Sequence, residues 1–196
     1  MIRSPSFTMT AFSGAWADSQ ALPNPVFDYV SAKWASSTTC LTVGVNTYYI
    51  LSSVLRSTDS GYTWTDVTNV NAMQGYLLTD IAAGPADEFY QVVYVVTGRN
   101  PVTSRPNGVV YTSKDGKTFS IAKGLNGLVS PGAGLNGAAV GYNNMDGWTA
   151  CVVVGVLGKI YRSYYDHNEN DFISWADVSP IRMTVMRSLR CSTTLT

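Results

Sequence analysis

Hydrophobic residues in this chain form short runs separated by turns rich in Gly, Asn, Asp and Ser. Three runs are strongly apolar and β-branched, at Cys40–Val45, Tyr90–Thr97 and Cys151–Val156. Weaker apolar segments precede them, at Tyr29–Trp34, Leu77–Ala82 and Ala138–Tyr142. Short runs of this composition, bounded by turn residues, predict β-strands. The expected fold class is therefore all-β.

The strand pattern repeats along the chain with a period of about fifty residues. Three segments align, Ser53–Ser57, Val109–Ser113 and Lys159–Ser163. The sequence W-T-D-V-T at residues 64–68 also matches W-A-D-V-S at residues 175–179. The repeats cover approximately residues 28–68, 76–122 and 135–179. Each is expected to form four antiparallel strands, which is typical of a propeller blade.

The turn at residues 57–64 has a composition that favours a tight, hydrogen-bonded loop. The Asp59 carboxylate can accept backbone N–H groups, and Gly61 can adopt a positive φ. The hydroxyl groups of Ser57 and Thr63 can hold the flanks, and Trp64 can cover the sheet. The turn reads S-T-D-S-G-Y-T-W, and residues 113–119 read S-K-D-G-K-T-F. Both resemble the Asp-box, or BNR, repeat of β-propellers.

The resemblance implies a structural role for the motif on the outer hairpin of each blade. A third, degenerate copy contains an insertion between its Ser and its Trp. The residues implicated are Ser57, Asp59, Gly61, Thr63, Trp64, Ser113, Asp115, Gly116, Thr118, Phe119, Ser163 and Trp175. Families with this motif include sialidases, other glycoside hydrolases, sorting receptors, assembly factors and carbohydrate-binding proteins. The motif alone therefore does not select a function.

A closed ring needs more than three blades, and the chain ends can supply a fourth. The sequence I-R-S at residues 2–4 resembles L-R-S at residues 55–57. Residues 1–12 and 182–196 are expected to share one blade, which gives a small four-bladed propeller and a single domain over residues 1–196. The alternative is a partial propeller or a fragment that completes its ring with another chain, so an oligomer remains open.

The charge of the chain argues against polyanionic partners. Thirteen Lys and Arg residues balance thirteen Asp and Glu residues, and only 13% of residues are charged. Nucleic acid is therefore not an expected partner. The sequence shows no signal peptide, and no apolar run is long enough for membrane insertion. The hydroxyl-rich composition favours an extracellular, cell-surface or virion protein, although the compartment stays unknown.

Two of the three cysteines, Cys40 and Cys151, are expected to be buried thiols, with a disulfide between them as the alternative. Cys40 and Cys151 lie in similar apolar strands, and Cys191 resembles a third copy of that position. Free cysteine behaves as a small core residue. The spacing of Cys and His residues does not fit a zinc site.

The insertion in the third repeat resembles a calcium-binding loop. Counted from Asp166, oxygen-bearing side chains occupy positions 1, 3 and 5, and a carboxylate occupies position 12. The candidate ligands are Asp166, Asn168, Asn170, the Phe172 carbonyl and Asp177. A Gly is missing at position 6, and Asp177 is also explained as the repeat counterpart of Asp66. A solvated polar turn is the alternative, and calcium is the only cofactor to consider.

Two loops are candidates for ligand recognition. Residues 98–107 contain Arg99 and Arg105, and residues 143–148 contain Asn143, Asn144 and Trp148. Tryptophan stacking combined with amide hydrogen bonds suits neutral sugars. Ordinary hairpin loops are the alternative for both segments.

Enzyme activity has little support in the residues. A sialidase would need an arginine cluster, a Tyr/Glu pair and an acidic proton donor. Neither Glu88 nor Glu169 has a matching Tyr, and the single histidine, His167, has no triad partners. The expected function is a non-catalytic recognition or structural module that binds a glycan or a protein surface. A glycoside hydrolase of sialidase type and a protein assembly factor are the alternatives.

Overall fold

A computed structural model describes residues 26–86, 91–101, 107–125, 134–143 and 145–180 of the chain. These residues form three antiparallel β-sheets, with one short helix, α1 (Val70–Met73), and one 3-10 turn at Val156–Gly158. The all-β expectation is confirmed. None of the helices in the described residues is long and apolar enough to cross a membrane.

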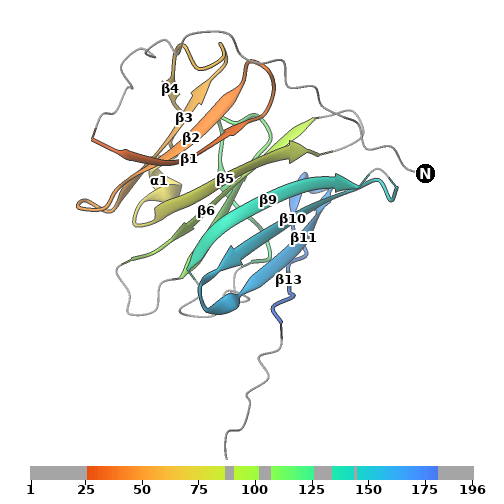
Figure 1. The fold of residues 1–196 in the computed structure, drawn as a ribbon. Coiled ribbons are helices and arrows are strands. Elements are labelled where there is room, and N and C mark those ends of the chain that lie inside the picture. The colour runs from red at the N-terminus through yellow and green to blue at the C-terminus, as the bar shows by residue number, and fades with distance from the viewer. Residues whose placement is uncertain (1–25, 87–90, 102–106, 126–133, 144, 181–196) are drawn as a thin grey trace, which may run out of the picture.

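Each sheet is a run of neighbouring antiparallel strands taken in chain order (Figure 1). The first sheet contains β1 (Asp28–Trp34), β2 (Cys40–Asn46), β3 (Leu51–Ser57) and β4 (Thr65–Asp66). The second contains β5 (Leu77–Pro85), β6 (Val92–Arg99), β7 (Gly108–Ser113) and β8 (Ser120–Ile121). The third contains β9 (Leu135–Asn143), β10 (Trp148–Gly155) and β11 (Ile160–Asp166), with β12 (Asp171–Phe172) and β13 (Ala176–Asp177) both pairing with β11. The sheets lie within the three sequence repeats.

The three sheets share one strand register. In each, a residue of the strong apolar run lies opposite a serine of the next strand, as in Cys40↔Ser57, Tyr94↔Ser113 and Cys151↔Ser163. The segment after each short outer strand is held by the same backbone hydrogen bond, from Val67 to Val54, from Ala122 to Val110 and from Val178 to Ile160, each at 2.9 Å. Residues can therefore be compared position by position between sheets.

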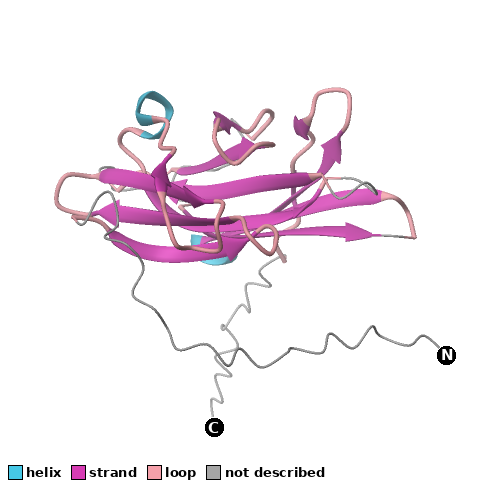
Figure 2. Cartoon of the chain, turned by 90° about the horizontal axis from the view of Figure 1, so that it is seen from above, coloured by secondary structure: helices cyan, strands magenta, loops and turns pink. Residues whose placement is uncertain are grey.

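The sheets stack face to face, with the second sheet in the middle. Figure 1 shows β5 and β6 between the strands of the first and third sheets, and Figure 2 shows the same arrangement from above, along the stack. Tyr94 and Val96 of β6 belong to the core shared with the first sheet, whereas Val93 and Val95 belong to the core shared with the third. Because both faces of β6 are buried, its sequence is a continuous apolar run and does not alternate.

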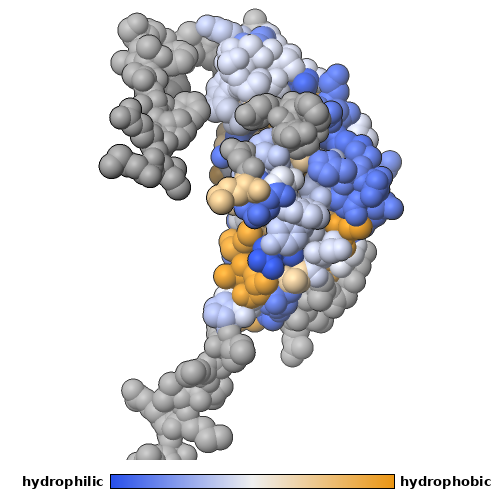
Figure 3. All heavy atoms as spheres, turned by 90° about the vertical axis from the view of Figure 1, so that its right-hand side faces the viewer, coloured by the Kyte–Doolittle hydropathy of each residue, from blue (hydrophilic) through white to orange (hydrophobic). Residues whose placement is uncertain are grey.

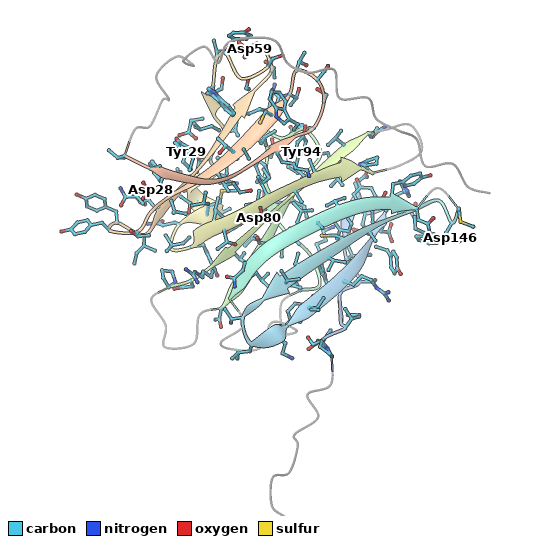
Figure 4. All side chains as sticks on the ribbon, in the orientation of Figure 1. Asp28, Tyr29, Asp59, Asp80, Tyr94 and Asp146 are labelled. Atoms are coloured by element: carbon cyan, nitrogen blue, oxygen red, sulfur yellow. The ribbon has the colours of Figure 1, made fainter. Side chains whose placement is uncertain are left out.

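Asp80 joins all three sheets through their first strands. Its Oδ1 accepts a hydrogen bond from the Ser31 hydroxyl of β1 at 2.6 Å, and its Oδ2 accepts one from the Ala138 N–H of β9 at 2.9 Å. Oδ1 also accepts the backbone N–H of Ile81 at 2.9 Å. Figure 4 shows Asp80 on β5, in the middle of the sheet stack. This carboxylate therefore links elements 49 and 58 residues away in the sequence.

The two cysteines of the described residues are buried free thiols, as expected. Cys40 and Cys151 lie in different sheets, and each is less than 5% exposed. Burial raises the pKa of both thiols.

The expected fourth blade falls on residues 1–12 and 182–196, which lie outside the described residues, as does Cys191. Within the described residues, none of the three sheets closes on itself.

Candidate functional site

A cleft of about 790 Å³ lies on the outer face of the third sheet, at the end that carries the β9–β10 turn. Eight residues line it, namely Gly141, Tyr142, Asn143, Asp146, Trp148, Ala150, Arg162 and Tyr164. They come from three neighbouring strands and one turn. Side chains alternate between the two faces of a strand, so Tyr161 and Tyr165 of β11 enter the core while Arg162 and Tyr164 face outward.

The aromatic part of the cleft consists of Trp148 and Tyr164. Their rings meet edge to face, with centroids 6.0 Å apart and an interplanar angle of 68°. Trp148 is 55% exposed and Tyr164 is 42% exposed, so both offer ring surface to a ligand. The strand register explains the meeting, because Trp148 begins β10 and Tyr164 lies opposite Ala150, two residues further along β10.

Arg162 supplies hydrogen-bond donors beside the aromatic pair. Its guanidinium carbon lies 5.1 Å from the centroid of the Tyr164 ring, which is a cation–π contact. No ion pair within the described residues involves Arg162. A guanidinium that is oriented by stacking and carries several N–H groups can donate hydrogen bonds to hydroxyl or carboxylate oxygens of a ligand.

The turn between β9 and β10 supplies an acceptor. The Asn143 Nδ2 donates to Asp146 Oδ2 at 2.6 Å, and the Asn143 Oδ1 accepts the Met145 N–H at 2.9 Å. Gly147 has a φ of +67° and donates its N–H to the Asn143 carbonyl at 2.9 Å. These bonds fix Asp146, which retains one carboxylate oxygen for a ligand. Asp146 lies at the tip of this turn in Figure 4.

The surface around this turn is mixed in character. Figure 3 shows the side of the molecule that lies on the right in Figure 1, where hydrophobic side chains form separate patches among hydrophilic ones. A combination of exposed ring faces, a guanidinium, an amide and a carboxylate provides both stacking and hydrogen bonding. Such sites suit small polar ligands that also have an apolar face.

The structure brings together only part of the residue set that the sequence indicated for ligand binding. Asn143 and Trp148 line the cleft, whereas Asn144 and Arg105 lie outside the described residues. Arg99 ends β6 in the second sheet and does not line the cleft.

Sequence reasoning missed Tyr142, Asp146, Arg162 and Tyr164. Alternation along β11 could have shown that Arg162 and Tyr164 share one face. It could not have shown that this face is the outer one.

The first turn motif forms a compact hydrogen-bond network. Asp59 Oδ1 accepts the Ser57 hydroxyl at 2.8 Å and the Thr63 N–H at 2.9 Å, while Oδ2 accepts the Thr63 hydroxyl at 2.6 Å. Gly61 has a φ of +88° and donates its N–H to Ser57 Oγ at 2.9 Å. Trp64 is partly buried. The hydrogen bonds from the Thr63 side chain, the Thr63 backbone and Ser57 lower the pKa of Asp59 to about 2.

The second turn repeats this network. Asp115 accepts the Ser113 hydroxyl at 2.9 Å and the Thr118 N–H at 2.8 Å, and Gly116 has a φ of +64°. Partial desolvation raises the pKa of Asp115, but hydrogen bonds from Thr118, Lys117 and Ser113 outweigh it and lower the pKa to about 2. The aromatic residue of this turn, Phe119, is 1% exposed and packs between the first and second sheets.

The third copy is built differently. The Ser163 hydroxyl points to the Tyr164 carbonyl at 3.4 Å instead of an aspartate. Trp175 is buried between the second and third sheets, and its Nε1 donates to the Phe172 carbonyl at 2.9 Å. The aromatic residue therefore keeps its place in the core while the polar network is lost.

The structure does not bring the five candidate calcium ligands together. Asp166 lies on β11, opposite Asp171 of β12. Asp177 of β13 lies opposite Tyr161, which is five residues before Asp166 on β11. At about 3.3 Å per residue, the backbone positions of Asp166 and Asp177 are separated by roughly 16 Å along the strand. Asp177 forms an ion pair with Lys159 at 2.7 Å, and this side-chain contact is the main reason that its pKa falls to about 2.

The remaining members of the calcium set form a local turn. Asp166 Oδ1 accepts the N–H groups of Asn168 and Glu169 at 2.8 and 3.1 Å, and Asn170 has a φ of +53°. Within the described residues, no group of three or more His, Cys, Asp or Glu side chains is arranged to hold a metal ion.

Glu169, one of two glutamates in the chain, forms an exposed ion pair with Lys123 at 2.7 Å. The other glutamate, Glu88, lies outside the described residues. His167 contacts the edge of the Tyr165 ring at 5.3 Å between centroids.

No protein-family model matches the chain, and no curated protein matches its sequence.

Proposed function

We propose that the chain is a non-catalytic recognition module that binds a glycan in the cleft formed by Trp148, Tyr164, Arg162 and Asp146. The observation that carries this proposal is the exposed Trp148–Tyr164 pair, flanked by one cationic donor and one carboxylate acceptor.

A pyranose matches this arrangement in both shape and chemistry. One face of a sugar ring presents C–H groups, which stack on an aromatic ring, and its rim presents hydroxyl groups. Arg162 can donate to a hydroxyl oxygen, and Asp146 can accept from a hydroxyl hydrogen. Because the two charged groups have opposite sign, the cleft favours neutral saccharides.

Binding without hydrolysis fits the carboxylates of the cleft. Glycosidases of the usual type place two carboxyl groups on either side of the scissile bond. Asp146 is the only carboxylate among the described lining residues, and Asn143 holds one of its oxygens. These features favour recognition over a sialidase-type reaction.

The proposal includes a propeller arrangement of Asp-box blades. Three facts support it: the sheets share one register, they stack face to face in chain order, and two of the turns have the same Ser–Asp–Gly network. Their aromatic residues also follow one rule, since Phe119 and Trp175 each pack toward the preceding sheet.

A glycan array tests the proposed function. The purified chain and a Trp148→Ala variant are applied to a broad array, once with calcium and once with chelator. We expect selective binding by the wild type, loss of binding in the variant, and no effect of chelator. Trp34→Ala is the matched control, because Trp34 is 53% exposed on β1 of the first sheet. A blank array, or equal loss in both variants, would refute the site and favour a protein partner.

A further inference from the structure

A polar depression of about 400 Å³ lies between the second and third sheets. The second sheet supplies Val93 of β6 and Thr112 of β7, together with residues that follow β7. The third sheet supplies residues 169–171, at the turn between β11 and β12. The depression is separate from the cleft of Trp148, because the two share no lining residue.

Strand register explains why there is space at this interface. The position that Arg56 holds between the first and second sheets is held by Thr112 between the second and third. In the same way, the position of Tyr94 is held by Cys151. The second interface therefore has two small side chains where the first interface has two large ones.

In the first interface, Arg56 brings a guanidinium close to the second sheet. Alternation along β3 places Arg56 on the same face as Val54, which is buried against the second sheet. The Arg56 Nε is buried. Burial raises the pKa of the Tyr94 hydroxyl, and the positive charge of Arg56 opposes this rise. A cation of the chain itself thus occupies this position in the first interface.

The depression in the second interface contains a buried carboxylate. Asp171 is 6% exposed and is one of the lining residues. Its Oδ1 accepts the Phe172 N–H at 2.8 Å, and its Oδ2 accepts the Lys123 N–H at 3.4 Å. Both donors are backbone groups, and neither ion pair in the described part of the chain includes Asp171. Buried charges are normally paired, and each carboxylate oxygen can accept a further hydrogen bond.

The other charged groups of the depression are engaged or exposed. Lys123 Nζ forms its ion pair with Glu169 at 2.7 Å. Asp115 accepts hydrogen bonds from its own turn, including the Thr118 N–H at 2.8 Å. Lys114 is exposed, so water and salt screen its charge. Because three carboxylates and two ammonium groups line the depression, its charge favours a cationic ligand.

We propose that this depression binds the guanidinium group of an arginine side chain presented by a peptide or protein partner. The guanidinium occupies the position that Arg56 holds in the first interface and donates hydrogen bonds to Asp171. Its planar set of N–H groups matches the geometry of a carboxylate. The alkyl stem of the arginine contacts Val93, which is the apolar part of the lining. This site does not depend on the glycan cleft.

A titration followed by the backbone amide signals in NMR spectra of the full chain tests the inference. The probe is a tripeptide with blocked ends that has arginine between two glycines. Its counterpart contains citrulline, which has nearly the same shape but no charge. We expect the amide signals of Lys123 and Phe172 to shift with the arginine peptide. The dissociation constant should be at least about tenfold lower than for the citrulline peptide.

Two variants test the carboxylate and the space separately. Asp171→Asn removes the charge with little change in shape and should weaken binding of the arginine peptide about tenfold or more. Asp166→Asn is the matched control, because Asp166 belongs to the same loop and does not line the depression. Thr112→Arg places a guanidinium of the chain itself at the position of Arg56. It should abolish peptide binding without lowering Tm, because the new side chain can pair with Asp171.

Four results would overturn the inference. Absence of shifts at millimolar arginine peptide would show that the depression does not bind it. Equal affinity for the arginine and citrulline peptides would show that the site does not select a cation. Equal binding by the wild type and Asp171→Asn would exclude a role for the carboxylate, and unchanged binding by Thr112→Arg would place the peptide elsewhere. Unchanged amide signals from β2 and β6 would show that each variant remains folded.

Discussion

The carboxylate of Asp80 links three sheets, and replacing it should weaken their association. In an Asp80→Asn variant the side chain keeps its shape but exchanges one acceptor oxygen for an NH₂ group. With the amide oxygen facing Ser31, the NH₂ group faces the Ala138 N–H, and two donors then oppose each other at a site where the wild-type distance is 2.9 Å.

The expected loss of stability follows from the hydrogen bonds involved. A hydrogen bond to a charged acceptor contributes about 1.5–3 kcal/mol, and an unsatisfied buried donor costs about 1–3 kcal/mol. Asp80 is only partly buried, so water can satisfy part of the lost bonding. We expect Asp80→Asn to lower the free energy of unfolding by about 2 kcal/mol, and Asp80→Ala to lower it by about 3 kcal/mol because Ser31 also loses its partner.

Equilibrium unfolding in urea measures this difference. The midpoint should fall without a change in the slope of free energy against urea, because the surface exposed on unfolding is unaltered. In a thermal scan, 2 kcal/mol corresponds to a decrease in Tm of about 4–8 °C for a chain of this size.

Asp28→Asn is the matched control. Asp28 begins β1, is exposed, and lies away from Asp80 in Figure 4. Its replacement should change stability by less than about 0.5 kcal/mol. If Asp80→Asn is no more destabilising than Asp28→Asn, the reasoning that this carboxylate ties the sheets together is refuted.

Three further predictions concern packing and titration. Tyr111→Phe removes the buried hydroxyl that donates to α1 at 2.7 Å and should cost about 1–2 kcal/mol in urea unfolding, whereas a neutral result would mean that water replaces the bond. Gly84→Ala would place a Cβ 2.7 Å from a Val140 methyl carbon and 3.0 Å from its carbonyl, so it should cost about 1–3 kcal/mol, while Gly141→Ala, with no atom within 4 Å, should leave Tm unchanged. The pKa of Asp115 is lowered to about 2, whereas an aspartate in the unfolded chain titrates near about 3.9. The stability that Asp115 contributes is therefore present above about pH 4 and is lost as the pH falls toward 2, so Asp115→Asn should lose less stability than the wild type over that interval. Equal loss of stability in the wild type and the variant between pH 4 and pH 2 would contradict the prediction.

Much of the strand layout could be predicted from the sequence. The strand predicted at Cys40–Val45 is β2, which continues one residue further, to Asn46. The predicted segment Val109–Ser113 falls within β7. These strands could be predicted because a strand that is buried on one or both faces has an alternating or continuous pattern of apolar residues. The helix α1 was not expected, since it has four residues and depends on an Asn69 cap, whose Oδ1 accepts the Ala72 N–H at 3.3 Å.

The candidate site was harder to predict, because it is assembled from strands that are apart in the sequence. The sequence indicated Trp148 and Asn143 by their chemistry, but Arg162 and Tyr164 reach them only through the β10–β11 register. The exposure of Val178 on the outer face of the third sheet could not be predicted for a related reason. Val178 lies in a sequence similar to that around Val67, W-A-D-V-S against W-T-D-V-T, and only the stacking order of the sheets distinguishes a covered position from an outer one.

Titration calorimetry with a saccharide that the chain selects on an array is the most direct test of glycan recognition in the cleft. We expect Trp148→Ala to raise the dissociation constant about tenfold or more, since loss of a stacking contact of about 1.5 kcal/mol corresponds to a tenfold loss of affinity. Trp34→Ala should bind as the wild type does. Equal affinity of wild type and Trp148→Ala would contradict the proposal and place the ligand elsewhere on the molecule.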